Sequence, residues 1–144
     1  MKITIENLTK KFGDFTAVNN FNATIESGEL IALLGPSGCG KSTMLNMLSG
    51  ILPVTEGRIY FDNDDVTDIG AEKRGVGLVF QNYALYPHMT VFDNMAFALK
   101  LRKVPKDEID KKVRNAARIL DLEKLLDRKP KALSGGQRQR VAMG

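Results

Sequence analysis

Apolar and polar residues alternate along the first part of the chain in a way that predicts β-strands. The alternation at Ile3–Ile5 and Phe21–Ile25 is typical of amphipathic strands, and together they predict a small antiparallel sheet. Arg58–Phe61 predicts a further strand that leads into a turn. Leu30–Leu34 is an unbroken apolar run, which favours a strand buried on both faces, and Val76–Phe80 is interpreted as another buried strand. The pattern therefore predicts a mixed sheet system.

The hydrophobic period changes to that of a helix in two parts of the chain. Lys41–Leu48 predicts a short helix with Leu45 and Leu48 on its apolar face. Residues 90–133 have a longer helical pattern, and Thr90 followed by Asp93 resembles a capping box at its start. One face of this stretch carries Ile109, Val113, Ala116, Ala117 and Leu120. We therefore expect a helical insert after the strands.

The segment Gly35–Ser42 carries the strongest chemical signal in the chain. It matches the phosphate loop G-x-x-x-x-G-K-[ST] and lies between a predicted buried strand and a predicted helix, which is the context that this motif requires. Its glycines let successive N–H groups face one centre, and the helix adds its positive N-terminal end. Lys41 would reach the β- and γ-phosphates, Ser42 would ligate Mg²⁺, and Thr43 could donate to the α-phosphate. The residues expected to hold ATP-Mg are Gly35, Ser37, Gly38, Cys39, Gly40, Lys41, Ser42 and Thr43.

A glycine turn that only joins a strand to a helix is the competing interpretation of this segment. Such a turn would need neither the Lys-Ser pair nor three glycines, so phosphate binding is favoured. Cys39 is interpreted as a small loop residue rather than a redox group. As the only cysteine it excludes an internal disulfide, which fits a reducing compartment.

Composition narrows the class of protein and its partners. With 43% apolar and 26% charged residues, the chain has the balance of an ordinary globular domain. The net charge of +4 comes from basic residues interleaved with acidic ones, which favours a solvated surface. Arg128–Arg140 is the densest basic stretch and has no aromatic residue for base stacking, so we expect no nucleic-acid partner. No window approaches the length of an apolar membrane span, and no secretion signal is expected.

A second motif, Leu133–Gln137, places Ser134 where it would cap a short helix. The two glycines beside this cap would leave N–H groups open to an anion, so a second phosphate contact is expected. Taken in order with Gly35–Thr43 and Val79–Gln81, this motif resembles the ATP-binding subunit of ABC transporters. The stretches Gln81–His88 and Asp127–Leu133 further resemble the maltose and multiple-sugar importer branch, a match shared in part with polyamine and iron importers.

The resemblance covers the whole chain and implies an α/β fold of the P-loop NTPase class, with a RecA-like core, an antiparallel β-subdomain and a helical insert. It predicts one nucleotide-binding domain over residues 1–144. Within that domain it assigns 1–30 and 54–68 to the β-subdomain, 31–53 and 69–88 to the phosphate-loop core, and 89–144 to a helical subdomain with the signature motif.

Roles for individual residues also follow from the resemblance. Phe12 would stack on adenine, although a loop aromatic in the small sheet is the alternative. Gln81 would contact Mg²⁺, sense the γ-phosphate and report to transmembrane permease subunits through the Gln81–His88 region. His88, the only histidine, is interpreted as structural. In a head-to-tail homodimer, Ser134, Gly136 and Gln137 of one copy would close over the nucleotide held by the other copy's Lys41.

The family also needs an Asp-Glu strand and a histidine after the signature helix, and these do not occur in this sequence. We therefore expect an incomplete core with an open apolar sheet edge, low solubility or a swapped oligomer, and binding of ATP with negligible hydrolysis. The full protein would be a peripheral subunit on the cytoplasmic face of the membrane that couples ATP hydrolysis to uptake of a solute, with a carbohydrate favoured.

Three alternative functions stay open at this point. The first is a soluble ABC-type ATPase of the DNA-repair or translation-linked kind, which would have no membrane partner. The second is a phosphotransferase or GTPase, although no Asn-Lys-x-Asp guanine motif occurs and the signature segment would be unexplained. The third is a remnant that only binds nucleotide.

Overall fold

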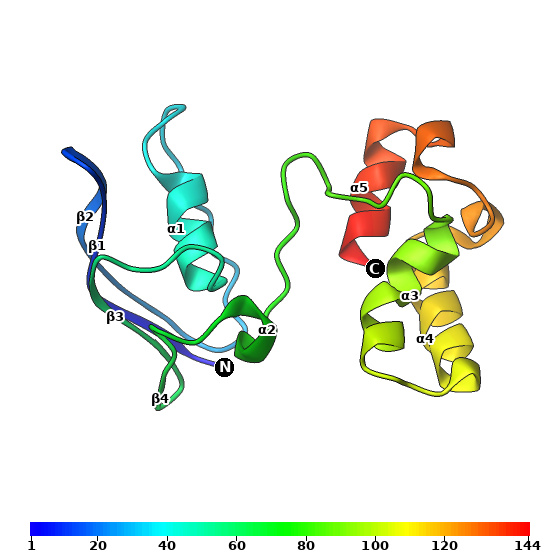
Figure 1. Cartoon of the computed structure of the whole chain (residues 1–144), viewed down its shortest axis with the longest axis horizontal. Helices are drawn as coiled ribbons and strands as arrows, with labels where there is room; N and C mark the ends of the chain where they lie inside the picture. The colour runs from blue at the N-terminus through cyan, green and yellow to red at the C-terminus, as the bar shows by residue number, and fades with distance from the viewer. The chain divides into compact units, whose positions relative to one another are not determined.

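The computed structural model describes all 144 residues, and the chain divides into two compact units. The first unit comprises Met1–Leu78 and the second Val79–Gly144. Figure 1 labels the strands and the first two helices in the first unit and the remaining helices in the second. Each unit is described by itself below. The finer subdomain boundaries inferred from the sequence stay predictions.

The first unit is built on a four-stranded antiparallel sheet. Its strands are β1 (Ile3–Phe12), β2 (Phe15–Ile25), β3 (Glu56–Phe61) and β4 (Asp64–Asp65), in the order β2-β1-β3-β4. Ile5 on β1 pairs with Ala23 of β2 on one side and with Ile59 of β3 on the other. These antiparallel strand pairs confirm the sheet expected from the alternating pattern.

Helix α1 (Lys41–Leu48) covers the sheet and confirms the predicted helix, but its buried face differs in part from the expected one. Met44 and Met47 are buried and Leu48 is partly buried against the same core, whereas Leu45 is 44% exposed. The pair Met44 and Met47 and the pair Leu45 and Leu48 both follow a helical spacing, so packing against the strands decided which of these residues lie deepest. The core of this unit consists of Ile5, Leu8, Val18, Met44, Met47, Ile59, Phe61 and Val66.

The two buried strands expected at Leu30–Leu34 and Val76–Phe80 are corrected by the structure. Neither segment is a strand, and Leu30 and Leu34 are 99% and 91% exposed. Apolar composition alone does not form a strand, because a strand needs a neighbour to accept and donate its backbone hydrogen bonds. The sheet contains β1 to β4 only, so these segments have no partner strand within the chain.

The short helix α2 (Ala71–Arg74) is the last helix of the first unit and places a cation inside it. Arg74 is only 6% exposed, and its guanidinium donates to the carbonyl oxygens of Met47 (2.6 Å), Leu48 (3.0 Å), Thr67 (2.9 Å) and Ile69 (2.6 Å). Two of these carbonyls belong to the last turn of α1, where a helix favours positive charge. Burial lowers the pKa of Arg74 from its ordinary value.

The second unit is helical, as the sequence predicted. It contains α3 (Val91–Leu101), α4 (Lys106–Ile119), two 3₁₀ turns at Glu123–Leu125 and Pro130–Ala132, and α5 (Gly135–Met143). Its core confirms the predicted face of α4 and joins it to the other elements. The buried residues are Val91, Met95, Ala96, Ile109, Val113, Ala117, Leu122, Leu126, Leu133 and Val141, with Ala116 and Leu120 packed beside them.

The start of α3 is fully hydrogen-bonded. Thr90 caps the helix, since its hydroxyl accepts from the Asp93 N–H at 3.0 Å, which confirms the cap expected from the sequence. The first two N–H groups of α3, those of Val91 and Phe92, donate to the carbonyl oxygens of Arg128 and Leu126. These bonds attach the segment that precedes α5 to α3.

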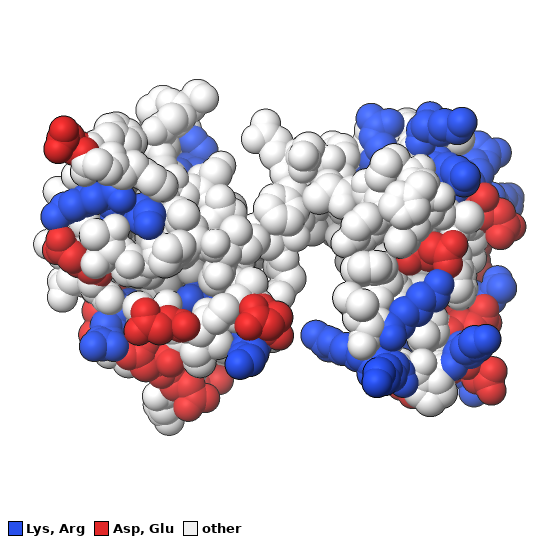
Figure 2. All heavy atoms as spheres, in the orientation of Figure 1, with Lys and Arg blue, Asp and Glu red and all other residues white.

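Charge is distributed unevenly between the units. Of the 21 Lys and Arg residues, 14 lie in the second unit, whereas 10 of the 17 Asp and Glu residues lie in the first. The net charge of +4 is therefore the sum of about −3 and +7. Figure 2 shows the greater number of Lys and Arg side chains over the helical unit. Part of this charge is paired along α4, as in Lys112–Glu108 and Arg114–Asp110, which is typical of a solvated helix surface.

Candidate functional site

The glycine-rich loop leads directly into α1, and its Gly38 and Gly40 have positive φ angles. Gly40 is the N-cap of α1 with φ 93°, and no side chain caps the helix. The first N–H groups of α1 are therefore open at the end where the helix dipole is positive. Gly38 also has a positive φ, of 82°, which residues with a β-carbon rarely adopt.

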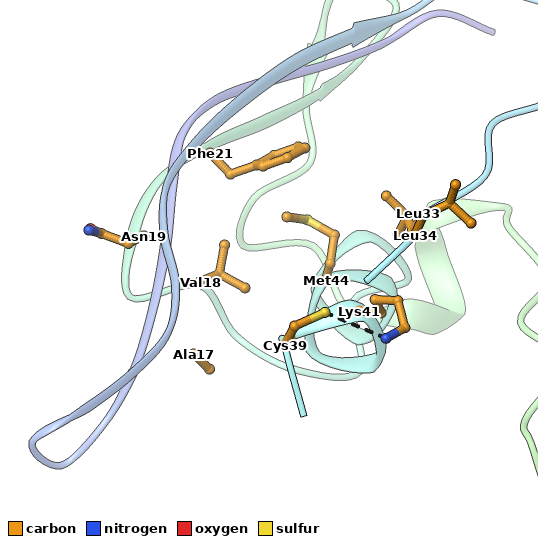
Figure 3. A pocket seen from close by; sticks show the side chains of 10 residues that line it. Ala17, Val18, Asn19, Phe21, Leu33, Leu34, Cys39, Lys41 and Met44 are labelled. Carbon is orange, nitrogen blue, oxygen red and sulfur yellow. Dashed lines mark hydrogen bonds between the residues drawn. The ribbon is translucent and has the colours of Figure 1, made fainter. Parts of the chain in front are cut away.

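The ammonium group of Lys41 is turned back over this loop. It donates to the carbonyl oxygens of Gly35 at 2.8 Å and Pro36 at 2.7 Å, and lies 3.5 Å from the Cys39 sulfur. Figure 3 shows the last of these contacts as a dashed line. The structure thus places the single cation of the motif at the centre of the loop. Ser42 and Thr43 follow in the first turn of α1.

A hollow of about 260 Å³ lies beside the loop within the first unit. One of its walls is β2, and α1 and the segment before the loop form the others (Figure 3). Its lining is mostly apolar apart from Asn19 and Lys41: Ala17, Val18, Asn19, Phe21, Leu33, Leu34, Cys39, Gly40, Lys41 and Met44. Sequence reasoning did not find the β2 residues, because nothing in an amphipathic strand shows which loop it will face.

Phe12, expected to stack on adenine, is in the same unit but does not line this hollow. It ends β1, is 49% exposed, and pairs with Phe15 across the hairpin. The Lys10 ammonium lies 5.1 Å from the centre of the Phe12 ring and also donates to the Pro53 carbonyl oxygen at 2.7 Å. The ring is partly exposed to solvent despite this cation–π contact.

Gln81 and the signature residues belong to the second unit, and their geometry is described there alone. Gln81 is exposed in a turn that follows the Val76–Phe80 segment. Ser134 caps α5 as predicted: its hydroxyl accepts from the Gln137 N–H at 3.3 Å, while the Gln137 side chain accepts from the Ser134 N–H at 2.8 Å. The glutamine of the signature is therefore part of a capping box.

The glycines beside this cap keep the start of α5 open. A β-carbon built on Gly135 or Gly136 meets nothing within 4 Å. Arg138 of α5 holds the residue before the cap in place, because its guanidinium donates to the Leu133 carbonyl oxygen at 2.7 Å. The arrangement presents backbone N–H groups at a helix N-terminus, which is a common way for proteins to contact an anion.

Metal-binding side chains do not gather anywhere in the chain. No group of three or more His, Cys, Asp or Glu side chains lies close enough together to hold an ion. The structure also contains no helix with the length and apolar character needed to cross a membrane.

Comparison with known proteins assigns the family. The model of the ABC transporter family matches residues 18–144. The chain belongs to the ABC transporter family. The resemblance inferred from the phosphate loop and the signature motif is thereby confirmed.

Three curated relatives of this ABC transporter chain match nearly all of it. An uncharacterized ABC transporter ATP-binding protein of Sinorhizobium fredii is 57% identical over 142 residues, covering 99% of this chain and 38% of the relative. The sn-glycerol-3-phosphate import ATP-binding protein of Bordetella avium is 54% identical and covered to 40%. The maltose/maltodextrin import ATP-binding protein of Vibrio parahaemolyticus is 52% identical and covered to 38%. The chain thus spans about two fifths of the length of these relatives.

A solved ABC cassette has the same fold. The dimeric structure of an ATP-binding cassette in a post-hydrolysis state, bound to ADP and Pi, superposes with a TM-score of 0.86 at 34% identity. The match covers 98% of this chain and 67% of that cassette. The P-loop NTPase class predicted from the sequence is confirmed, and the chain is incomplete relative to that cassette.

Proposed function

We propose that this chain is the ATP-binding part of an ABC importer subunit, which couples ATP binding and hydrolysis to uptake of a carbohydrate-type solute. The observation that supports it most directly is the position of the Lys41 ammonium over a glycine loop at the open start of α1. Relatives named for maltose/maltodextrin and sn-glycerol-3-phosphate import support the solute class.

In this proposal the loop binds the triphosphate. The phosphates replace the Gly35 and Pro36 carbonyl oxygens as partners of Lys41, and the N–H groups of the loop and of α1 donate to them. The Ser42 hydroxyl, next to Lys41 on the first turn of α1, would be a ligand of Mg²⁺. One protein oxygen suits this ion, because Mg²⁺ binds few protein oxygens and completes its coordination shell with phosphate and water. Gln81 is the second proposed Mg²⁺ contact, and Phe12 offers its exposed face to adenine.

The remaining roles need other chains. A second copy arranged head to tail would contribute Ser134, Gly136 and Gln137 to the nucleotide, excluding water from the phosphates. Membrane subunits would bind the Gln81–His88 region and hold the protein at the cytoplasmic face of the membrane. The Asp-Glu pair that orients the attacking water does not occur in these residues, so we propose that this chain binds ATP and hydrolyses it negligibly.

Calorimetric titration with ATP-Mg tests the proposal. The chain should bind ATP-Mg at millimolar ligand or below and prefer it to GTP-Mg. Lys41→Ala should weaken binding at least tenfold, because charge-assisted contacts to phosphate are lost. Lys73→Ala is the matched control, since Lys73 is exposed on α2 of the same unit and should leave the affinity unchanged.

Two results would contradict the proposal. A folded chain that binds no magnesium nucleotide would exclude the proposed site altogether. Phosphate release clearly above that of the Lys41→Ala variant would show that these residues suffice for hydrolysis, against the proposal.

A further inference from the structure

Asn94 makes more side-chain hydrogen bonds than any other residue of the second unit, and the proposed nucleotide chemistry gives it no role. It lies in the first half of α3. Its amide nitrogen donates to the carbonyl oxygens of Tyr86 (3.2 Å), Met89 (3.4 Å) and Thr90 (2.9 Å). Its amide oxygen accepts from the Tyr86 N–H at 2.8 Å. One side chain therefore serves four backbone groups of the preceding loop.

The bonding pattern fits the amide of an asparagine, which is both an acceptor and a donor. The Tyr86 N–H needs an acceptor, which fixes the orientation of the amide, and the two amide N–H groups then face the carbonyl oxygens of Tyr86, Met89 and Thr90. An aspartate would keep the acceptor but lose both N–H donors, and an aliphatic side chain would lose all four bonds. Tyr86 meets this amide through both its N–H and its C=O, as a residue in a strand pair meets its neighbour.

The loop held in this way carries an exposed aromatic group. The Tyr86 ring packs on Phe97 of α3 with centroids 4.6 Å apart, and His88 meets its edge at 6.1 Å. Tyr86 is nevertheless 41% exposed. The loop enters through two residues of positive φ, Tyr83 at 65° and Ala84 at 50°, a conformation that non-glycine residues keep only when surrounding contacts hold it.

We propose that Asn94 is a positioning residue, which holds Tyr86–Thr90 in the conformation that the membrane subunits of the transporter bind. This inference rests on the proposed function, which assigns the Gln81–His88 region to those subunits. An aromatic anchor fixed before binding loses less conformational entropy when the partner docks than a mobile one does. The amide of Asn94 supplies this fixation, because the backbone around Tyr86 has only one hydrogen bond of its own, from the Met89 N–H to the Tyr86 carbonyl oxygen.

Substitution of Asn94 by alanine in the full-length protein should remove the four side-chain hydrogen bonds between α3 and the preceding loop. Alanine favours the helix, so α3 itself should remain folded. The amide hydrogen of Tyr86 should exchange about tenfold faster or more, while amides in the centres of α3 and α4 keep their rates. Affinity for the detergent-solubilised membrane subunits of the same transporter should fall about tenfold, and affinity for ATP-Mg should not change.

Asn115→Ala is the matched control. Asn115 is exposed on α4, and its side chain accepts a single bond from Arg118 at 2.8 Å. This variant should match the wild type in all three measurements. Asn94→Asp, which keeps the acceptor for the Tyr86 N–H and loses the donors, should also reduce affinity for the membrane subunits.

Each other outcome contradicts a definite part of the argument. An unchanged exchange rate at Tyr86 in Asn94→Ala would show that the amide does not hold the loop. Faster exchange with unchanged affinity for the membrane subunits would overturn the positioning role and leave the proposed function intact. Failure of the wild type to bind those subunits, while it still binds ATP-Mg, would overturn both the partner assignment and the inference built on it.

Discussion

Gly40 lies against the backbone of Ala17, so closely that a β-carbon on residue 40 would come within 2.5 Å of the Ala17 carbonyl oxygen. The contact brings the phosphate loop against β2. Gly40 has φ 93°, a backbone conformation that glycine adopts without strain. Two separate physical reasons therefore require glycine at the start of α1. The loop and the sheet are held together where the nucleotide is proposed to bind.

Gly40→Ala should accordingly destabilise the first unit by about 2–4 kcal/mol, because it adds both backbone strain and a clash with a main-chain oxygen. Gly38→Ala is the matched control: Gly38 has φ 82°, but a β-carbon there meets nothing within 4 Å. It should cost only the strain of about 1 kcal/mol. Amide exchange in β1 to β3 measures both, and equal losses for the two variants would rule out the clash.

Arg74→Met should also destabilise the first unit, by about 3 kcal/mol. The substitution preserves much of the side-chain volume but leaves four carbonyl oxygens without the donor that now serves them. Amides of α1 and β3 should exchange faster in proportion. The neighbouring Lys73→Met, on the exposed side of α2, should change these rates little. If the two variants behave alike, the buried guanidinium is not a structural requirement.

The stability of the second unit should fall in acid partly through Asp93. The Lys100 ammonium at 2.6 Å and then the Thr90 hydroxyl at 3.0 Å lower the pKa of this carboxyl below its ordinary value of 3.8. The folded state therefore releases this proton more readily than the unfolded state. The stabilisation is fully present above the unfolded pKa and is lost as pH falls through the folded one.

Asp93→Asn removes this dependence, so its unfolding free energy should vary less with pH below about 4 than that of the wild type. Lys100→Met should reproduce the larger part of the change, since Lys100 is the principal cause of the lowered pKa. Urea unfolding of the three proteins at pH values between about 2.5 and 6 measures the slopes. Identical slopes would show that Asp93 does not contribute.

The features that the sequence predicted correctly depend on neighbours along the chain. The Thr90 and Ser134 caps need partners only three residues away, and the face of α4 follows from the helical period alone. The phosphate-loop motif is likewise a continuous segment, and the nucleotide-binding role of its residues stays a prediction. Such features can be read from a sequence because their hydrogen bonds and faces are set within one or two turns.

The features that the sequence did not predict depend on segments far apart. Leu30–Leu34 has the composition of a buried strand, but a strand forms only beside another, and the sheet offers it none. The burial of Met44 rather than Leu45 was settled by the sheet surface beneath α1. Arg74 gave no signal as a buried residue, because its partners are main-chain carbonyls, which every sequence has.

Ser134 allows the capping of α5 to be separated from its proposed contact with a nucleotide phosphate. Serine and aspartate both accept a hydrogen bond at an N-cap, so Ser134→Asp should keep α5 as stable as in the wild type, whereas Ser134→Ala should cost about 1 kcal/mol. The carboxylate, however, adds a negative charge where an anion is proposed to bind. In the full-length protein, Ser134→Asp should therefore reduce ATP-dependent dimerisation at least tenfold while leaving ATP affinity of the isolated copy unchanged. Sedimentation with and without ATP-Mg measures the dimer, and amide exchange at Gln137 measures the cap. Normal dimerisation of Ser134→Asp would mean that the start of α5 serves the helix alone.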